Sequence, residues 1–129
     1  IARGGWKPPS RLRTGVVARG RGHRHRAGQT LPQPRVRSAG GSSSQPLDDL
    51  LGTGYALVGP PDLLRGVSVP PALRGRLVPL QAGDDGGIAA WLTPARVVLV
   101  RPDRVVYGTA RTAQDVPLLM ARAAAALSS

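Results

Sequence analysis

Two histidines close together are the first residues in this sequence that could support chemistry. His23 and His25 are separated by one residue, and such a pair can join a metal site when a third ligand converges on it. The chain has no cysteine, and the nearest carboxylate in the sequence is that of Asp48. Arginines surround the two imidazoles and would repel a divalent cation. We therefore interpret the pair as part of a solvated loop.

The arginines around these histidines form a motif of their own. Residues 19–26 read Arg-Gly-Arg-Gly-His-Arg-His-Arg, a pattern similar to the arginine-glycine arms that bind RNA through phosphate contacts and guanidinium stacking. No aromatic residue is interleaved, and the nearest one, Trp6, lies far upstream. We therefore favour the alternative, in which this run pairs with an acidic surface elsewhere in a larger protein.

Two pairs of carboxylates could serve acid/base chemistry or bind Mg²⁺. They are Asp48-Asp49 and Asp84-Asp85. Each pair lies in turn-forming sequence, where aspartate is expected as a helix cap or turn residue. The sequence therefore favours a structural role for both pairs.

Glycines and arginines offer two further candidates for anion binding. Gly52-Thr53-Gly54 is too short for a phosphate-binding loop, which needs a further glycine and a lysine at fixed spacing. Arg101 and Arg104 flank a turn and could bind an anion. We expect them instead to pair at the surface with Asp103, which lies between them.

Charge and composition divide the chain into two parts. The formal net charge is +11, and the first forty-seven residues contribute +10 of it, because no acidic residue precedes Asp48. This basic stretch is rich in Gly, Pro and Ser and shows no hydrophobic period, which is typical of an extended or disordered arm. We predict a boundary after residue 46, with residues 1–46 as arm and linker and 47–129 as the folded domain. Within the arm, residues 12–17 and 31–36 could each lie along a folded surface.

Several absences limit the possible functions. Without cysteine there are no disulfides, thiolate metal sites, cysteine nucleophiles or Cys-x-x-Cys redox centres. No segment approaches eighteen consecutive apolar residues, and no apolar signal sequence is present at the N-terminus, so a cytoplasmic location is expected. The sequence begins at Ile1 and not at a methionine, which suggests a fragment of a longer product.

The elements that would position these residues centre on a predicted hairpin. Residues 97–100 and 105–110 are rich in β-branched residues and flank Arg101-Pro102-Asp103-Arg104, where Pro102 and Asp103 suit the second and third positions of a type I turn. Residues 97–100 are all apolar, which indicates a strand covered on both faces. Helices should therefore lie on both sides of the sheet.

Shorter signals predict the remaining elements. Residues 47–51 suit one helical turn ended by Gly52, and residues 55–59 suit a buried strand stopped by prolines. Asp62 could cap a helix over residues 63–67, residues 76–81 suit an edge strand, and residues 88–92 are helical or extended. Asp115 should begin a final helix whose apolar stripe consists of Val116, Leu119, Met120, Ala123 and Leu127. The order predicts a small α/β unit.

Three segments resemble one protein family. They are residues 27–36 (Ala-Gly-Gln-Thr-Leu-Pro-Gln-Pro-Arg-Val), 47–59 (Leu-Asp-Asp-Leu-Leu-Gly-Thr-Gly-Tyr-Ala-Leu-Val-Gly) and 100–108 (Val-Arg-Pro-Asp-Arg-Val-Val-Tyr-Gly). Together they are similar to the C-terminal region of FAD-dependent aromatic hydroxylases of the 3-(3-hydroxyphenyl)propionate hydroxylase-like group. The resemblance extends from about residue 12 to the end of the chain.

This resemblance implies a thioredoxin-like domain appended to a monooxygenase that uses FAD, NAD(P)H and O₂ to hydroxylate a phenolic ring. In that family the appended domain lacks redox cysteines and has a structural or subunit-contact role. Its expected partners are the FAD-binding domain, in cis or in trans, and a second subunit in a homodimer. The chain lacks the Gly-x-Gly-x-x-Gly fingerprint that binds the flavin pyrophosphate. No catalytic, cofactor-binding or metal-binding residue of the family can be assigned to it, so we expect the isolated chain to be inactive.

A second hypothesis comes from a different class of protein. In it the chain is a small stand-alone binding protein whose basic arm engages nucleic acid or an acidic protein partner. A dinucleotide-binding sequence upstream of Ile1 in the same coding frame would favour the accessory domain over this alternative.

Overall fold

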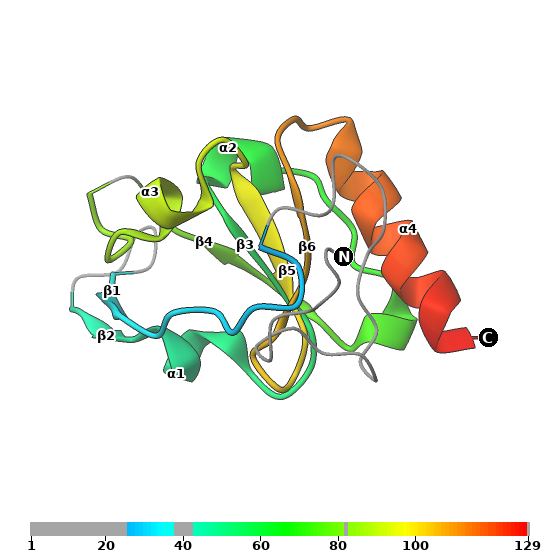
Figure 1. The fold of residues 1–129 in the computed structure, drawn as a ribbon, viewed down its shortest axis with the longest axis horizontal. Coiled ribbons are helices and arrows are strands. Elements are labelled where there is room, and N and C mark those ends of the chain that lie inside the picture. Colours follow the sequence, from blue (N-terminus) through cyan, green and yellow to red (C-terminus); the bar gives the residue numbers. More distant parts are fainter. Residues whose placement is uncertain (1–25, 38–42, 82, 129) are drawn as a thin grey trace, which may run out of the picture.

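A four-stranded mixed sheet forms the centre of the fold (Figure 1), in a computed structural model that describes residues 26–37, 43–81 and 83–128. The strands are β3 (Ala56–Gly59), β4 (Arg76–Pro79), β5 (Val97–Val100) and β6 (Val106–Ala110). Their order is β4-β3-β5-β6; β3 is parallel to β4 and antiparallel to β5, and β5 is antiparallel to β6. This is the thioredoxin-like α/β fold that was predicted.

One face of the sheet is covered by the longest helix and two short ones. These are α4 (Asp115–Ser128), α2 (Pro61–Leu64) and the 3₁₀ helix η2 (Pro71–Leu73). Their apolar side chains pack with Leu57, Val97 and Leu99 in one buried cluster, the α4-side core. The predicted stripe of α4 is buried as far as Ala123, but Leu127 is 45% exposed, because it lies in the last turn and outside this cluster.

The other face is covered by short elements and by the chain that precedes them. The helices α1 (Leu47–Leu51) and α3 (Ile88–Leu92) contribute to a second cluster, the α1-side core, which also contains Val98 and Val100. Strand β5 is therefore covered on both faces, as its apolar sequence predicts. Each of the two helices has only five residues, so together they cover limited area.

Part of the predicted arm completes this second face. Residues 26–37, here called the strap, run along the molecule with Leu31 and Val36 buried in the α1-side core (Figure 1). The strap ends in β1 (Arg35–Val36), which pairs antiparallel with β2 (Gln45–Pro46) directly before α1. The boundary predicted after residue 46 must therefore move, because the strap belongs to the folded unit. The suggestion that residues 31–36 lie along a folded surface is confirmed, whereas residues 12–17 lie outside the described part of the chain.

The β5–β6 hairpin contains an irregularity that the sequence did not predict. Leu99 pairs with Gly108 and Val100 pairs with Val106, so Tyr107 is an extra residue on β6. Such a bulge changes the direction in which the following side chains point. Tyr107 consequently packs in the α4-side core, while its neighbour Val106 packs in the α1-side core.

The other predicted elements are present in the structure, but several bounds differ. Strand β3 begins one residue later than predicted, at Ala56, and β4 ends two residues earlier, at Pro79. Helix α1 ends at Gly52, β4 is an edge strand, residues 88–92 are helical, and α4 begins at Asp115. Helix α2 begins at Pro61 and ends at Leu64, so Asp62 lies in its first turn and does not cap it. Proline suits the first helical position because its missing N–H would have no partner there. No helix in the described ranges is long and apolar enough to cross a membrane.

Candidate functional site

The turn between β5 and β6, residues 101–104, contains a network of hydrogen bonds. The Arg104 amide donates to the Arg101 carbonyl at 2.9 Å, and the Arg101 amide donates to the Val105 carbonyl at 2.9 Å. Asp103 accepts a further hydrogen bond from the Val105 amide at 3.2 Å. Arg104 itself has φ +69°, so an L-residue is held in the left-handed region. Pro102 and Asp103 take the turn positions expected from their chemistry.

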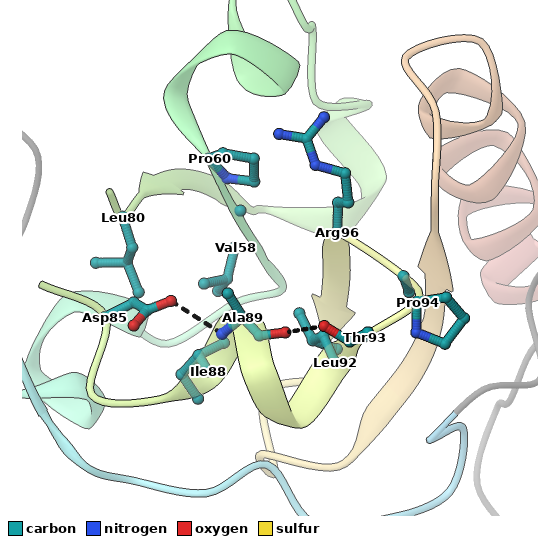
Figure 2. A pocket seen from close by; sticks show the side chains of 12 residues that line it. Val58, Pro60, Leu80, Asp85, Ile88, Ala89, Leu92, Thr93, Pro94 and Arg96 are labelled. Atoms are coloured by element: carbon teal, nitrogen blue, oxygen red, sulfur yellow. Dashed lines mark hydrogen bonds between the residues drawn. The ribbon is translucent and has the colours of Figure 1, made fainter. Parts of the chain in front are cut away.

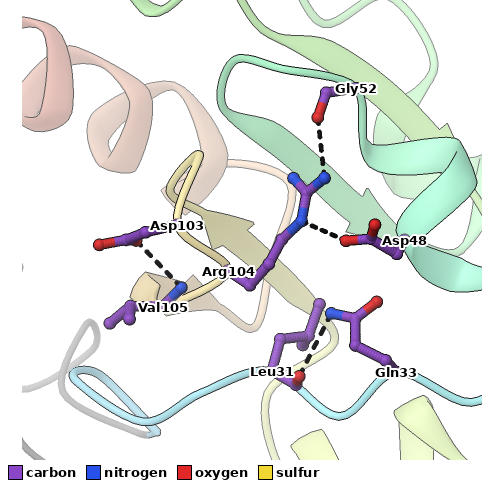
Figure 3. A network of polar contacts seen from close by, with 7 residues as sticks. All are labelled: Leu31, Gln33, Asp48, Gly52, Asp103, Arg104 and Val105. Carbon is purple, nitrogen blue, oxygen red and sulfur yellow. Dashed lines mark hydrogen bonds and ion pairs between the residues drawn. The ribbon is translucent and has the colours of Figure 1, made fainter.

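The two arginines of this turn have different partners. Arg101 pairs with Asp103, with 2.6 Å between Nη2 and Oδ2, as predicted. Arg104 does not: its Nε donates to the carboxylate of Asp48, and its Nη2 donates to the Gly52 carbonyl at 2.9 Å (Figure 3). The prediction that Asp103 pairs with both arginines is therefore wrong for Arg104. The left-handed backbone at this residue accompanies a side chain that reaches α1 and not the neighbouring carboxylate.

The same turn also holds the strap. The Arg104 carbonyl accepts a hydrogen bond from the Leu31 amide at 2.8 Å. Along the edge of β6, Gly28 donates to the Val106 carbonyl at 2.9 Å, and the Val106 amide donates to the Gln29 carbonyl at 2.8 Å. Arg104 therefore joins the strap, α1 and the hairpin, which are the three segments that carry the family resemblance. We call Leu31, Asp48, Gly52 and Arg104 the Arg104 junction.

The geometry of this turn is that of a structural joint and not of an anion site. Within the described part of the chain, the Nη1 atoms of Arg101 and Arg104 are buried without a hydrogen-bond partner. An anion from solvent cannot reach these buried atoms without rearrangement of the turn. Nη2 of Arg101 and both Nε and Nη2 of Arg104 already donate to carboxylate or carbonyl oxygens. Removing the arginine should therefore affect folding.

Arg104→Met is expected to lower the free energy of unfolding by about 1.5 to 3 kcal/mol, the usual value for hydrogen bonds that involve a charged group. The Asp48 side chain is 55% exposed, so solvent weakens that ion pair and the Gly52 carbonyl should account for most of the loss. Chemical denaturation measures the change, and hydrogen exchange should become faster at Leu31. Arg111→Met at an exposed position is the matched control, and equal midpoints for the two variants would contradict the structural role.

The carboxylates of the two pairs make different contacts in the structure. Asp85 is buried, and its two oxygens accept hydrogen bonds from the Gly87 amide at 3.1 Å and the Ala89 amide at 2.9 Å, at the start of α3. Asp84 pairs with Arg37 at 3.9 Å, and Asp48 belongs to the Arg104 junction. The predicted structural use is confirmed for Asp85. Over the described ranges, no three His, Cys, Asp or Glu side chains come together as metal ligands would.

Of the basic run, residues 19–26, the structure describes only Arg26. His23, His25 and Arg19 to Arg24 lie outside the described residues. The guanidinium of Arg26 lies over the ring of Trp91, 4.6 Å from its centroid, and its Nε donates to the Trp91 carbonyl at 3.1 Å. Its Nη1 donates to the Gln29 side chain at 3.3 Å. The first described residue of the strap is thus attached to α3 by charge, stacking and hydrogen bonds.

Two tyrosines in the α4-side core have shifted ionisation. Burial raises the pKa of Tyr55, while the nearby charge of Arg101 partly opposes this effect. Burial also raises the pKa of Tyr107, and the neighbouring Tyr55 adds to the shift. Both phenol groups are therefore protonated at neutral pH, and a protonated phenol cannot accept a proton as a general base.

A pocket that the sequence did not predict opens where β3 ends and β5 begins (Figure 2). Its volume is about 220 Å³. Its walls are mainly apolar, with polar groups from Asp85, Thr93 and Arg96. The lining residues are Val58, Gly59, Pro60, Leu80, Asp85, Ile88, Ala89, Leu92, Thr93, Pro94, Ala95 and Arg96. In the sequence, Pro60 and Pro94 indicate only the ends of elements, so nothing in the local pattern revealed that these segments meet.

Comparison with known proteins gives one informative similarity. No protein-family model matches the sequence, and no curated protein matches it at a significant level. Among solved structures, the chain is similar to the crystal structure of the flavin-dependent monooxygenase PieE in complex with FAD and substrate, with 26% sequence identity and a TM-score of 0.50. The match covers 77% of this chain and 20% of the PieE chain, so this chain spans about one fifth of that protein's length. The finding agrees with the family resemblance at the level of a region shared with a flavin-dependent monooxygenase.

Proposed function

We propose that this chain is the C-terminal accessory domain of an FAD-dependent aromatic-ring monooxygenase, with a structural or subunit-contact role. The observation that carries the proposal is the similarity to PieE, which extends over 77% of this chain but only 20% of the monooxygenase. The partners would be the FAD-binding domain, in cis or in trans, and a second subunit. FAD and NAD(P)H would belong to the parent enzyme.

In the described part of the chain, the turn after β3 lacks the features that usually bind FAD. A flavin pyrophosphate usually binds the N–H groups of a glycine-rich turn and the helix that follows it. Here the turn after β3 leads through Pro60 and Pro61 into a helix of four residues, and proline has no N–H to donate. The 220 Å³ pocket at this edge is below the usual size of sites for drug-sized ligands.

The use of the polar residues also favours a structural role. Arg104 joins the hairpin to Asp48 and Gly52 of the α1 region. Arg101 pairs with Asp103 within the turn, and Asp85 accepts hydrogen bonds at the start of α3. Catalytic groups need access to a substrate and a pKa suited to proton transfer. The contacts of these side chains instead hold the strap, α1, α3 and the hairpin in place.

Purified chain incubated with FAD and then desalted is expected to retain no flavin and to be colourless. Absorbance in the flavin bands measures this, and free FAD passed over the same column is the control. Stoichiometric retention of flavin would overturn the proposal. The coding frame upstream of Ile1 provides a second test, because the accessory role requires a dinucleotide-binding sequence there or on a separate partner chain that binds this one.

A further inference from the structure

The pocket between β3, α3 and the start of β5 has the interior of a small-ligand site. Its inner wall is formed by Val58, Leu80, Ile88 and Leu92, all at most 4% exposed. A dry apolar cavity of about 150 Å³ is large enough to bind benzene. The 220 Å³ here can therefore hold one ring, or a branched alkyl group of similar size, together with one or two further carbons.

The polar side chains of the pocket are not equally available to a ligand. Both oxygens of Asp85 accept hydrogen bonds from amides of the α3 region, and the Thr93 hydroxyl donates to the Ala89 carbonyl at 2.9 Å. Figure 2 shows Asp85 and Arg96 on opposite sides of the pocket. The guanidinium of Arg96 is thus the lining group that offers positive charge, at the side away from the carboxylate.

Arg96 has a partner that a ligand can replace. Its Nη2 lies 3.6 Å from Oδ2 of Asp62, and the two side chains are 51% and 62% exposed. Exposed ion pairs of this kind contribute little stability and exchange readily. A ligand carboxylate could accept two parallel N–H donors from the guanidinium, a geometry that is stronger than the present single long contact.

We propose that this pocket binds a small monocarboxylic acid with a compact apolar body, such as a single ring or a branched alkyl group. The body lies against Val58, Ile88 and Leu92, and the carboxylate meets Arg96 at the rim. The negative charge of Asp85 disfavours the reverse orientation. The pocket also lies beyond the carboxyl ends of the parallel strands β3 and β4, the edge at which α/β sheets commonly bind ligands. This inference is independent of the proposed accessory role.

The test is an NMR titration of the full ¹⁵N-labelled chain with phenylacetate, with 4-methylpentanoate as an aliphatic probe and 2-phenylethanol as the uncharged analogue of phenylacetate. Saturable shifts are expected at the amides of Ala89, Thr93 and Ala95, with a Kd of about 1 mM for phenylacetate, as suits a ligand of this size. 2-Phenylethanol should bind about tenfold more weakly, because it makes no charge-assisted hydrogen bond.

Four variants assign the effect to particular residues. Arg96→Gln should remove the preference for phenylacetate over 2-phenylethanol, whereas Asp62→Asn should strengthen phenylacetate binding a few-fold by freeing the guanidinium. Ala89→Leu, at an exposed lining position, should fill the pocket and abolish the ligand-induced shifts at Thr93 and Ala95 with both phenylacetate and 2-phenylethanol. Arg65→Gln, an exposed arginine outside the pocket lining, is the matched control for charge and should bind like the parent chain.

Three results would overturn the proposal while each variant keeps the dispersed spectrum of the folded chain. The first is the absence of saturable shifts at the pocket amides with either acid. The second is equal affinity for phenylacetate and 2-phenylethanol. The third is an Arg96→Gln variant that keeps the preference for the acid, because the carboxylate would then be bound elsewhere.

Discussion

Val98→Asp and Leu99→Asp are each expected to unfold the domain, although the two side chains point to opposite faces of β5. Val98 is fully buried in the α1-side core, and Leu99 is 1% exposed in the α4-side core. Either aspartate would place a charge in the core without a partner. The free energy of unfolding of a typical domain is only about 5 to 15 kcal/mol, and this cost would remove much of it. Leu99→Ala, which leaves only a cavity, should cost about 2 to 5 kcal/mol.

Circular dichroism and denaturant midpoints measure these effects. Arg111→Asp, directly after β6 at an exposed position, is the control for introducing an aspartate into this hairpin and should leave the midpoint nearly unchanged. A Val98→Asp variant as stable as the parent chain would mean that the α1-side core does not exclude water. The strap would then not be part of the folded unit.

Gly54→Ala is expected to lower the free energy of unfolding by about 3 kcal/mol or more, as severe overpacking does. A Cβ at this position would lie 1.9 Å from the carbonyl oxygen of Arg74 and 2.7 Å from its carbonyl carbon, both backbone atoms. The loop before β3 would have to move away from the start of β4. Nearby, the Tyr55 amide donates to the Leu73 carbonyl at 3.2 Å and the Arg76 amide to the Tyr55 carbonyl at 3.1 Å, so these bonds would be disturbed.

Gly66→Ala separates this steric effect from the general cost of losing a glycine. A Cβ at Gly66 would meet no atom within 4 Å, but its φ of +74° is unfavourable for alanine and should cost about 1 to 2 kcal/mol. Thermal and chemical denaturation of the two variants give the comparison. If Gly54→Ala costs no more than Gly66→Ala, the close approach of the two loops does not constrain the fold.

Local signals were sufficient for most secondary structure. The proline and aspartate of residues 101–104 predicted the hairpin turn, Gly52 predicted the end of α1, and Asp115 predicted the start of α4. These predictions succeed because each depends on the backbone preferences of one to four adjacent residues. The uniformly apolar β5 also predicted correctly that both faces of the sheet are covered.

The site residues were predictable only in part. The pairing of Arg101 with Asp103 depends on residues two positions apart, and it was predicted. The contact of Arg104 with Asp48 joins residues 56 positions apart, so no local pattern could indicate it. The same limit applies to the pocket, where the end of β3, helix α3 and Arg96 meet only because the sheet order places β3 beside β5.

By itself, the sequence determined the α/β class, the hairpin, the buried central strand and the exclusion of cysteine chemistry. Only the tertiary structure decided that the strap belongs to the domain and that Arg104 joins three segments. The physical reason is that α1 and α3 are too short to cover their face of the sheet, so Leu31 and Val36 of the strap are buried there, although the strap contains no element longer than the two residues of β1. Two apolar residues five positions apart, in a segment whose one strand has two residues, carry no helix or strand period. Their burial depends on the uncovered sheet face, a property of the assembled fold.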